Sequence, residues 1–378
     1  MHIVADENMP AVAELCGDLG TIELVDGRRL TLNQLRDADI LLVRSVTPVN
    51  ASLLQHTRVR YVGTATAGTD HIDIDYLTAH GIHFASAPGC NATAVAEYVT
   101  SCVLTHCLIT ARNTSALTVG VIGCGHAGTA VIKMLSSLGI TCVLNDPPRA
   151  AREGVANFCS LQQALMADVV SLHVPLIRSG EWRTEQLIGP AEIAGLAANA
   201  LVINAARGGV LDEDAWLLGA NPAQSLILDC WVGEPKINLT LLDRCWIATP
   251  HIAGHTVDAR RRATQMLAAD LRAFLGFPVV ADEVPRLDVP EVLKPRVTPG
   301  QSLPTVLSII TQACDPVATT QTTRRLREVE VAAASGCFDE QRRQCGRRRE
   351  FSAYRVKMNE LDSPLQQTVA ALGFNAAE

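Results

Sequence analysis

The amino-acid sequence predicts an α/β protein with two doubly wound parallel sheets. Short apolar runs rich in β-branched residues, typical of buried parallel strands, alternate with segments of helical periodicity along most of the chain. Polar side chains follow the ends of several of these runs, which is the edge of a parallel sheet where ligands bind. The chain has 378 residues, too many for one compact core, so we expect two or three domains.

The clearest motif is VIGCGHAG at 121–128, whose three glycines have the spacing G-x-G-x-x-G. A strand-like run at 117–122 leads into it, and apolar residues recur at helical spacing over 127–138. A second strand-like run, 141–144, ends beside Asp146. Strand, glycine turn, helix, strand and acid together form the sequence pattern of a Rossmann unit. We therefore favour a dinucleotide site over a plain βαβ crossover without a ligand.

The parts of this motif match the parts of a dinucleotide. The glycines permit a tight turn, a close approach of the backbone to the pyrophosphate and close packing of helix on strand, while the helix N-terminus attracts the phosphates. Asp146 can accept hydrogen bonds from the adenosine ribose and would repel the extra phosphate of NADP. Arg149 and Arg152 keep NADP open as the alternative, but we expect NAD. The predicted cofactor contacts of this stretch are Gly123, Gly125, His126, Ala127, Gly128 and Asp146.

Composition excludes several classes of protein. Apolar residues make up 48% of the chain and charged residues 19%, which is typical of globular proteins. The net charge of −7 favours neither nucleic acid nor an anionic membrane as a partner. We find no apolar run of the length that crosses a membrane, and the opening MHIVADENMP lacks a signal-peptide pattern. We expect a cytoplasmic protein with no nucleic-acid or membrane partner.

The cysteines and the arginine-rich C-terminal stretch have unremarkable interpretations. Twelve cysteines are scattered without a C-x-x-C pair, so we expect reduced thiols and no metal site. Five arginines gather within 342–349, with acidic residues among and beside them. We interpret them as a solvated or subunit-facing surface rather than as a nucleic-acid patch.

Three polar residues beyond successive predicted strands suit the oxidation of a hydroxy acid. They are Arg207 in INAARGGVLDEDA, Glu234 in LDCWVGEP and His251 in TPHIAGH. A histidine can take the hydroxyl proton while hydride leaves the same carbon, and a carboxylate bonded to that histidine fixes its tautomer. An arginine offers a forked cation for a substrate carboxylate. Each residue alone is a weak signal, and their joint placement favours a dehydrogenase.

These motifs, taken in order, resemble the D-isomer-specific 2-hydroxyacid dehydrogenases over roughly residues 38–275. The resemblance implies that Arg207, Glu234 and His251 form the catalytic trio. It also implies that Asp229 lies against the nicotinamide end of the cofactor. Including that aspartate, the further cofactor contacts implied by the resemblance are Val174, Ala205, Asp229 and Gly254.

Segments near both ends, LLVRSVTPVN and FDEQRRQ among them, resemble one branch of this family over nearly the whole chain. That resemblance implies NAD-dependent oxidation of a small phosphorylated 2-hydroxy acid. The substrate contacts that it implies are Arg44, Ser45, Thr66 and His255. His255 stands where this branch usually has tyrosine, and an imidazole differs from a phenol in reach and charge.

The resemblance also implies a domain organisation. A flavodoxin-like substrate domain would take residues 1–95 and 259–284, a Rossmann NAD domain 96–258, and a C-terminal α+β dimerisation domain 285–378. We accordingly expect a homodimer. Two alternatives stay open: another dehydrogenase of the family, acting on an acid such as 3-phosphoglycerate, or an NAD-responsive binding protein without turnover.

Overall fold

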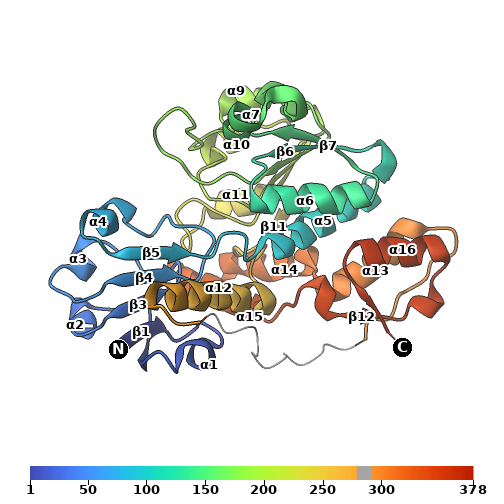
Figure 1. The fold of residues 1–378 in the computed structure, drawn as a ribbon. Coiled ribbons are helices and arrows are strands. Elements are labelled where there is room, and N and C mark those ends of the chain that lie inside the picture. Colours follow the sequence, from blue (N-terminus) through green and yellow to red (C-terminus); the bar gives the residue numbers. More distant parts are fainter. Residues whose placement is uncertain (279–291, 378) are drawn as a thin grey trace. The chain divides into compact units, whose positions relative to one another are not determined.

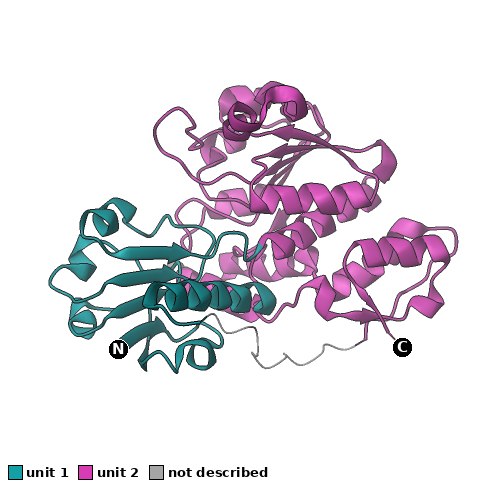
Figure 2. Cartoon of the chain, in the orientation of Figure 1, with its two compact units in different colours: residues 1–91, 257–288 teal, residues 92–256, 289–378 magenta. Residues whose placement is uncertain are grey.

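A computed structural model of the chain describes residues 1–278 and 292–377, which form two compact units (Figures 1 and 2). Unit 1 comprises Met1–Asn91 and residues 257–278. Unit 2 comprises Ala92–Thr256 and the described residues after 291. Each unit has its own sheet and its own core. The expected boundary between residues 284 and 285 falls outside the described residues.

Unit 1 is built on a sheet of five parallel strands in the order β2-β1-β3-β4-β5. This is the strand order of flavodoxin-like doubly wound folds, so the predicted fold class is confirmed for this unit. The strands are β1 (His2–Asp6), β2 (Thr21–Val25), β3 (Ile40–Val43), β4 (Tyr61–Thr64) and β5 (His83–Ser86).

Alternation along the strands of unit 1 creates two apolar layers. In β3, Ile40 and Leu42 pack on one face of the sheet, while Leu41 and Val43 pack on the other. Helices α1 (Val12–Cys16) and α12 (Val257–Leu275) contribute to the first layer. The second layer includes side chains of α2 (Leu32–Leu35), α3 (Ala51–Leu54) and α4 (Ile74–Ala79).

Unit 2 is built on six parallel strands in the order β11-β10-β9-β8-β6-β7. The direction of winding reverses between β6 and β8, and such a switch point is where doubly wound sheets bind ligands. Among the described residues, β7 is the last named strand at its edge of the sheet. The backbone N–H of Cys159 donates to Leu144 O of this strand at 2.8 Å. The strands are β6 (Thr118–Ile122), β7 (Thr141–Asn145), β8 (Val169–Leu172), β9 (Leu201–Asn204), β10 (Ser225–Leu228) and β11 (Ile247–Ala248).

Helices cover both faces of this second sheet. One apolar layer includes residues of α5 (Ala92–Ile109) and α6 (His126–Ser137), and α7 (Pro147–Glu153) follows β7. The opposite layer includes residues of four further helices. These are α8 (Leu161–Leu165), α9 (Pro190–Ala194), α10 (Glu213–Gly219) and α11 (Leu239–Arg244).

The C-terminal segment after residue 291 is α+β. Most of its buried apolar residues join the first of these layers, while Leu326 and Phe338 join the opposite one. Residues of α13 and α16 share an apolar cluster with α5, and two short strands pair in parallel. The elements are α13 (Ser302–Ala313), α14 (Pro316–Arg324), α15 (Val331–Cys345), β12 (Arg355–Val356), α16 (Ser363–Ala371) and β13 (Asn375–Ala376). Single 3-10 turns of the chain are η1 (Thr114–Ala116), η2 (Val155–Asn157), η3 (Arg325–Glu328), η4 (Phe351–Ala353) and η5 (Met358–Glu360).

The expectation that no apolar segment is long enough to cross a membrane is wrong for helix α5. Among the described residues it is the one helix that is long and apolar enough to cross a membrane by length and composition. However, 72% of it is buried inside the protein, as is usual for the core helix of an α/β unit. All twelve cysteines lie within the described residues, and none of them forms a disulfide there.

Strand β6 packs closely on helix α8 because Gly120 has no side chain. A methyl group added at Gly120 would lie 2.2 Å from the carbonyl oxygen of Ala164, which is backbone and cannot swing away. We expect Gly120→Ala to lower the free energy of unfolding by about 1–3 kcal/mol, measured by urea titration. Gly219→Ala is the matched control, because its added methyl group meets nothing within 4 Å. Equal stability of the two variants would contradict this account of the packing.

Candidate active site

The three glycines after β6 have three different physical reasons to be glycine. Gly123 has a positive φ of 89°, and a Cβ there would lie 2.7 Å from Val174 Cγ1. A Cβ on Gly128 would lie 2.0 Å from the carbonyl oxygen of Gly123. A Cβ on Gly125 would meet nothing within 4 Å. The first and third positions thus close the turn and pack helix on strand, while the second faces open space.

That open space lies at the start of α6, a helix of 12 residues. Gly125 is its N-cap, and no side chain caps the helix there. The first N–H groups of a helix, here those beginning at His126 and Ala127, have no partner within the helix and carry its positive dipole end. An uncapped helix end beside an open glycine turn fits the pyrophosphate of a dinucleotide.

Asp146 ties the glycine turn to the following helix. Its Oδ2 accepts from the backbone N–H of Cys124 at 2.8 Å, and its Oδ1 accepts from that of Arg149 at 2.9 Å. The Arg149 guanidinium donates to Cys124 O at 2.6 Å and pairs with Glu153. A carboxylate thus lies directly beside the glycine turn, where an adenosine ribose would be recognised, and it has a structural task that the sequence did not indicate.

Glu234 and His251 form a direct pair. Nδ1 of His251 lies 2.5 Å from Glu234 Oε1, and the backbone N–H of Trp231 donates to Glu234 Oε2 at 3.3 Å. Burial raises the pKa of Glu234, but the charge and hydrogen bond of His251, with the charge of Arg342, outweigh it and lower the pKa below its usual value. The carboxylate is therefore held ionised against the imidazole.

The loop that bears His251 is fixed by Asp229, which is 1% exposed. Asp229 Oδ1 accepts from Thr249 Oγ1 and from the backbone N–H of Ile252, both at 2.7 Å. Its Oδ2 accepts from the backbone N–H of Ala253 at 2.9 Å. His251 itself has a positive φ of 56°, an uncommon conformation for a residue with a side chain. Asp229 therefore holds the loop in the shape that presents the histidine.

Arg207 lies on a loop that touches the Glu234 loop. A Cβ on Gly208, the next residue, would lie 2.0 Å from the backbone oxygen of Trp231. The Arg207 guanidinium donates to Ala206 O at 2.8 Å. The two loops are thus in backbone contact just beyond the ends of β9 and β10.

The buried thiol of Cys230 shows that the charged groups of these loops share one neighbourhood. Burial raises its pKa well above the usual value. The charges of Asp229 and Glu234 raise it further, while those of Arg207 and Arg342 lower it. The structure therefore brings the three residues of the predicted trio together, with a further arginine that the sequence analysis did not single out.

The predicted substrate contacts of unit 1 follow two neighbouring strands. Arg44 and Ser45 come directly after β3, and Arg44 Nη1 lies 3.8 Å from Asp6 Oδ1. Thr66 follows β4, and its hydroxyl donates to Gly68 O at 2.8 Å. Because parallel strands end at one edge of a sheet, these hydroxyl and guanidinium groups gather at the carboxyl edge of unit 1.

The remaining predicted contacts belong to unit 2. Ala205 follows the last residue of β9, and Gly254 follows Ala253 in the loop held by Asp229. His255 ends that loop, and a Cβ on Gly346 would lie only 2.6 Å from its Nε2. The imidazole that replaces the expected tyrosine thus lies against the C-terminal segment.

We expected the arginine-rich stretch to form a solvated or subunit-facing surface. For Arg348 this expectation is wrong, because its guanidinium points into the protein. Its Nη2 donates to Ala253 O at 2.5 Å, to Ala94 O at 3.2 Å and to Ile252 O at 3.4 Å. It therefore holds the carbonyl groups of the same loop whose N–H groups Asp229 holds. No local pattern distinguishes Arg348 from its neighbours, because its partners are distant in sequence.

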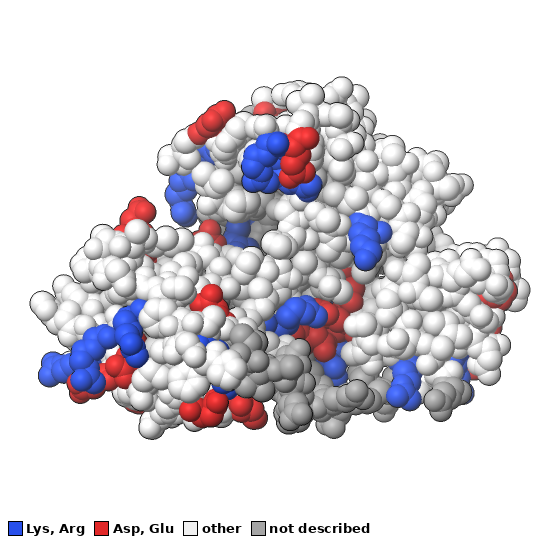
Figure 3. Space-filling model, viewed as in Figure 1, with Lys and Arg blue, Asp and Glu red and all other residues white. Residues whose placement is uncertain are grey.

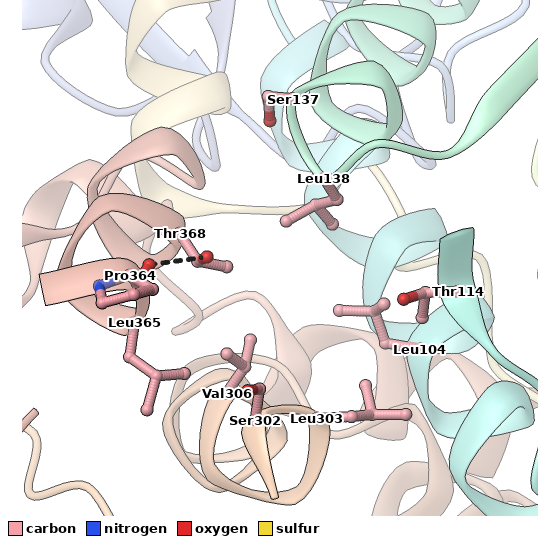
Figure 4. A pocket seen from close by; sticks show the side chains of 10 residues that line it. All are labelled: Leu104, Thr114, Ser137, Leu138, Ser302, Leu303, Val306, Pro364, Leu365 and Thr368. Atoms are coloured by element: carbon pink, nitrogen blue, oxygen red, sulfur yellow. Dashed lines mark hydrogen bonds between the residues drawn. The ribbon is translucent and has the colours of Figure 1, made fainter. Parts of the chain in front are cut away.

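Figure 3 shows positive and negative side chains interspersed on the face that it presents. Among the described residues, no group of three His, Cys, Asp or Glu side chains is arranged to hold a metal. A cavity of about 220 Å³ in unit 2 is lined by apolar and hydroxyl side chains, largely of α5, α6, α13 and α16 (Figure 4). None of the residues predicted for catalysis or cofactor binding lines it.

Comparison with known proteins assigns the family. Residues 3–285 match the catalytic domain of the D-isomer specific 2-hydroxyacid dehydrogenases. The chain belongs to this family. It is 42% identical to an erythronate-4-phosphate dehydrogenase of Marinobacter nauticus over 99% of both chains. It is 40% identical to one of Cronobacter sakazakii, over 100% of this chain and 98% of that relative.

A solved structure of the same fold covers less of the chain. The D-lactate dehydrogenase of Aquifex aeolicus, complexed with NAD and lactic acid, is similar with a TM-score of 0.59 and 23% identity. The similarity covers 96% of that enzyme but 73% of this chain. Both this likeness and the family match confirm the dehydrogenase fold. The C-terminal segment beyond residue 285 is shared with the full-length relatives instead.

Glu213 behind the Glu234 loop makes stability depend on pH. It is buried at the start of α10, and its Oε1 accepts from the backbone N–H of Val232 at 2.7 Å. Burial raises the pKa of this carboxyl from 4.5 to about 7. The folded protein therefore holds this proton more tightly than the unfolded chain, so the stabilisation is complete below about pH 4.5 and is lost as the pH rises through about 7.

In the wild-type protein, ionisation of Glu213 should lower the free energy of unfolding between pH 5 and pH 8. We expect Glu213→Gln to lose this contribution to the decline, because glutamine keeps the acceptor and cannot ionise. Urea titrations at several pH values measure it. Asp214→Asn, an exposed neighbour, is the control and should keep the decline. A Glu213→Gln protein with the full decline would show that another group causes it.

Proposed function

We propose that the chain is an NAD-dependent dehydrogenase that oxidises 4-phospho-D-erythronate to 2-oxo-3-hydroxy-4-phosphobutanoate, a step in the biosynthesis of pyridoxal 5′-phosphate. The observation that supports the chemistry most directly is the Glu234–His251 pair at 2.5 Å, with Arg207 on the adjoining loop. The substrate is proposed from the relatives that align over the whole chain.

In this proposal, His251 is the general base. Its Nε2 takes the proton of the C2 hydroxyl, while the C2–H bond breaks with its electron pair and the C–O bond becomes a carbonyl. Glu234, on Nδ1, fixes the tautomer that leaves Nε2 free to accept and stabilises the imidazolium that forms. The chemistry that NAD supplies when bound is acceptance of the hydride. The reverse reaction uses His251 as the acid.

Arg207 is the proposed carboxylate clamp. Its guanidinium can give two parallel N–H bonds to the C1 carboxylate and can stabilise the negative charge that develops on the C2 oxygen. It is half-buried at the end of β9, in the part of unit 2 where the charged groups meet. Partial burial strengthens such bonds relative to those in bulk water.

The cofactor would be held mainly by unit 2. The glycine turn and the N-terminus of α6 would bind the pyrophosphate, and Asp146 would accept from the ribose hydroxyls of adenosine. The structural relative binds NAD. We propose NAD over NADP because a carboxylate beside the ribose repels a 2′-phosphate. The further proposed contacts are Val174, Ala205, Asp229 and Gly254.

Substrate contacts from unit 1 complete the proposal. Arg44, Ser45 and Thr66 offer a guanidinium and two hydroxyls at one sheet edge, and His255 offers an imidazole from unit 2. The C-terminal segment is proposed to join two copies into a homodimer. Reduced cysteines agree with a cytoplasmic location.

The test is NADH formation by the purified chain with NAD and 4-phospho-D-erythronate, and with 3-phosphoglycerate run alongside. A trap for the oxo acid is included to pull the reaction forward. We expect turnover with the erythronate and little with the shorter acid. Turnover with 3-phosphoglycerate alone would keep the chemistry but refute the substrate. NAD binding without either turnover would favour a cofactor-responsive binding protein.

The control for the catalytic assignment is His251→Asn. We expect it to lose at least about 1,000-fold in kcat, in the upper range for a positioned acid–base group, while the Kd for NAD, measured by fluorescence, stays within about threefold. Loss of NAD binding together with turnover would count against a role on the substrate proton.

Cofactor choice is tested by Asp146→Asn. The amide keeps an oxygen acceptor for a backbone N–H but removes the negative charge. We expect the ratio of kcat/KM with NAD to that with NADP to fall by about tenfold or more, as for loss of one close charge repulsion. Asp315→Asn, which changes the cap of α14, is the control and should leave the ratio unchanged. An unchanged ratio for Asp146→Asn would refute the proposed ribose contact.

A further inference from the structure

One face of α15 lies along the loops that hold the catalytic pair. Phe338, Arg342 and Gly346 are spaced four residues apart, so they share one side of the helix. Phe338 is buried in the same apolar cluster as Trp231, which precedes Glu234. At the other end, Gly346 lies against the imidazole of His255. The helix thus spans from one catalytic loop to the next.

Arg342 is the middle residue of this face. Its charge acts on both Glu234 and Cys230, which places its guanidinium in their neighbourhood. Its Nε is buried and, among the described residues, has no hydrogen-bond partner. A buried guanidinium N–H without an acceptor is costly, and such groups are normally satisfied by protein, water or ligand.

The carboxylates near Arg342 are already engaged by other donors. Asp229 is engaged by three donors of its own loop, and Glu234 is engaged by His251 and Trp231. The charges of Arg207 and Arg342 act in the same neighbourhood as those of these two carboxylates. Two separate guanidinium groups match a substrate with an anionic group at each end, since each can bind an oxyanion through a forked pair of N–H groups.

We propose that Arg342 binds the phosphate of the substrate, while Arg207 binds its carboxylate. This inference rests on the proposed function. It gives the C-terminal segment a task in substrate recognition in addition to the proposed subunit contact. The segment lies beyond the family match and is shared with the full-length relatives, as a residue specific to their substrate would require.

The experiment compares 4-phospho-D-erythronate with D-erythronate, which lacks the phosphate, in wild-type protein, Arg342→Met and Arg342→Lys. For Arg342→Met we expect kcat/KM with the phosphorylated acid to fall about 10- to 100-fold, mostly through KM. With D-erythronate it should change less than about threefold. Arg342→Lys should lie between, because lysine keeps the charge and loses the fork.

The matched control is Arg343→Met. Arg343 is the next residue, its side chain is 70% exposed, and it pairs with Glu340 on the solvent side of α15. This variant should retain the kinetics of the wild type with both acids. A second readout needs no turnover: inorganic phosphate should raise the melting temperature of wild-type protein and of Arg343→Met, and should raise that of Arg342→Met much less.

Two results would overturn the inference. If Arg342→Met loses kcat/KM equally with both acids, Arg342 acts through Glu234 or through folding and does not bind the phosphate. If inorganic phosphate stabilises Arg342→Met as strongly as wild type, the phosphate binds elsewhere. Should wild-type protein fail to oxidise 4-phospho-D-erythronate, the proposed function fails, and the melting experiment still decides whether Arg342 binds phosphate.

Discussion

The buried carboxylate of Asp229 is the interaction on which the site depends. Three donors satisfy it, and a hydrogen bond to a charged group contributes about 1.5–3 kcal/mol, which counteracts the cost of burying the charge. On the other side of the same loop, burial lowers the pKa of Arg348, but Cys314, Glu97 and Asp229 raise it above its usual value. A loop held between an anion on its N–H groups and a cation on its carbonyl groups has little freedom, so His251 is positioned before any substrate arrives.

Much of the fold follows from short-range patterns. Most strands of both units are apolar runs, and the two beside the glycine turn were predicted within one residue, at Thr118–Ile122 and Thr141–Asn145. Thr21–Val25 was missed because it is an edge strand with mostly exposed side chains, so it lacks that signal. Helix α5 was not recognised as an apolar segment of membrane-spanning length because threonine and serine residues interrupt its apolar sequence. Its burial is a property of the packed fold and cannot be read from the sequence.

Some residues of the candidate site could likewise be predicted from the sequence, and others could not. Motifs predicted the glycine turn, Asp146 and the Glu234–His251 pair, because the spacing of residues in these motifs indicates where they lie in the fold. Arg342 and Arg348 have no such motif. The partners that tie them to the site loops lie about 90 to 110 residues earlier in the chain, and five arginines lie in the same stretch. Only the packed structure therefore shows which of them point inward.

The outer strand of the second sheet, β11, has only two residues, and its free side does not face solvent. The backbone N–H of Ala248 donates to Thr320 Oγ1 of α14 at 3.0 Å. An unprotected strand edge recruits other chains, and proteins commonly cover such edges with a helix. The C-terminal segment therefore covers the β11 edge of the sheet of unit 2. Cutting the chain back to the length of its shorter relatives would yield an aggregation-prone protein rather than a smaller enzyme.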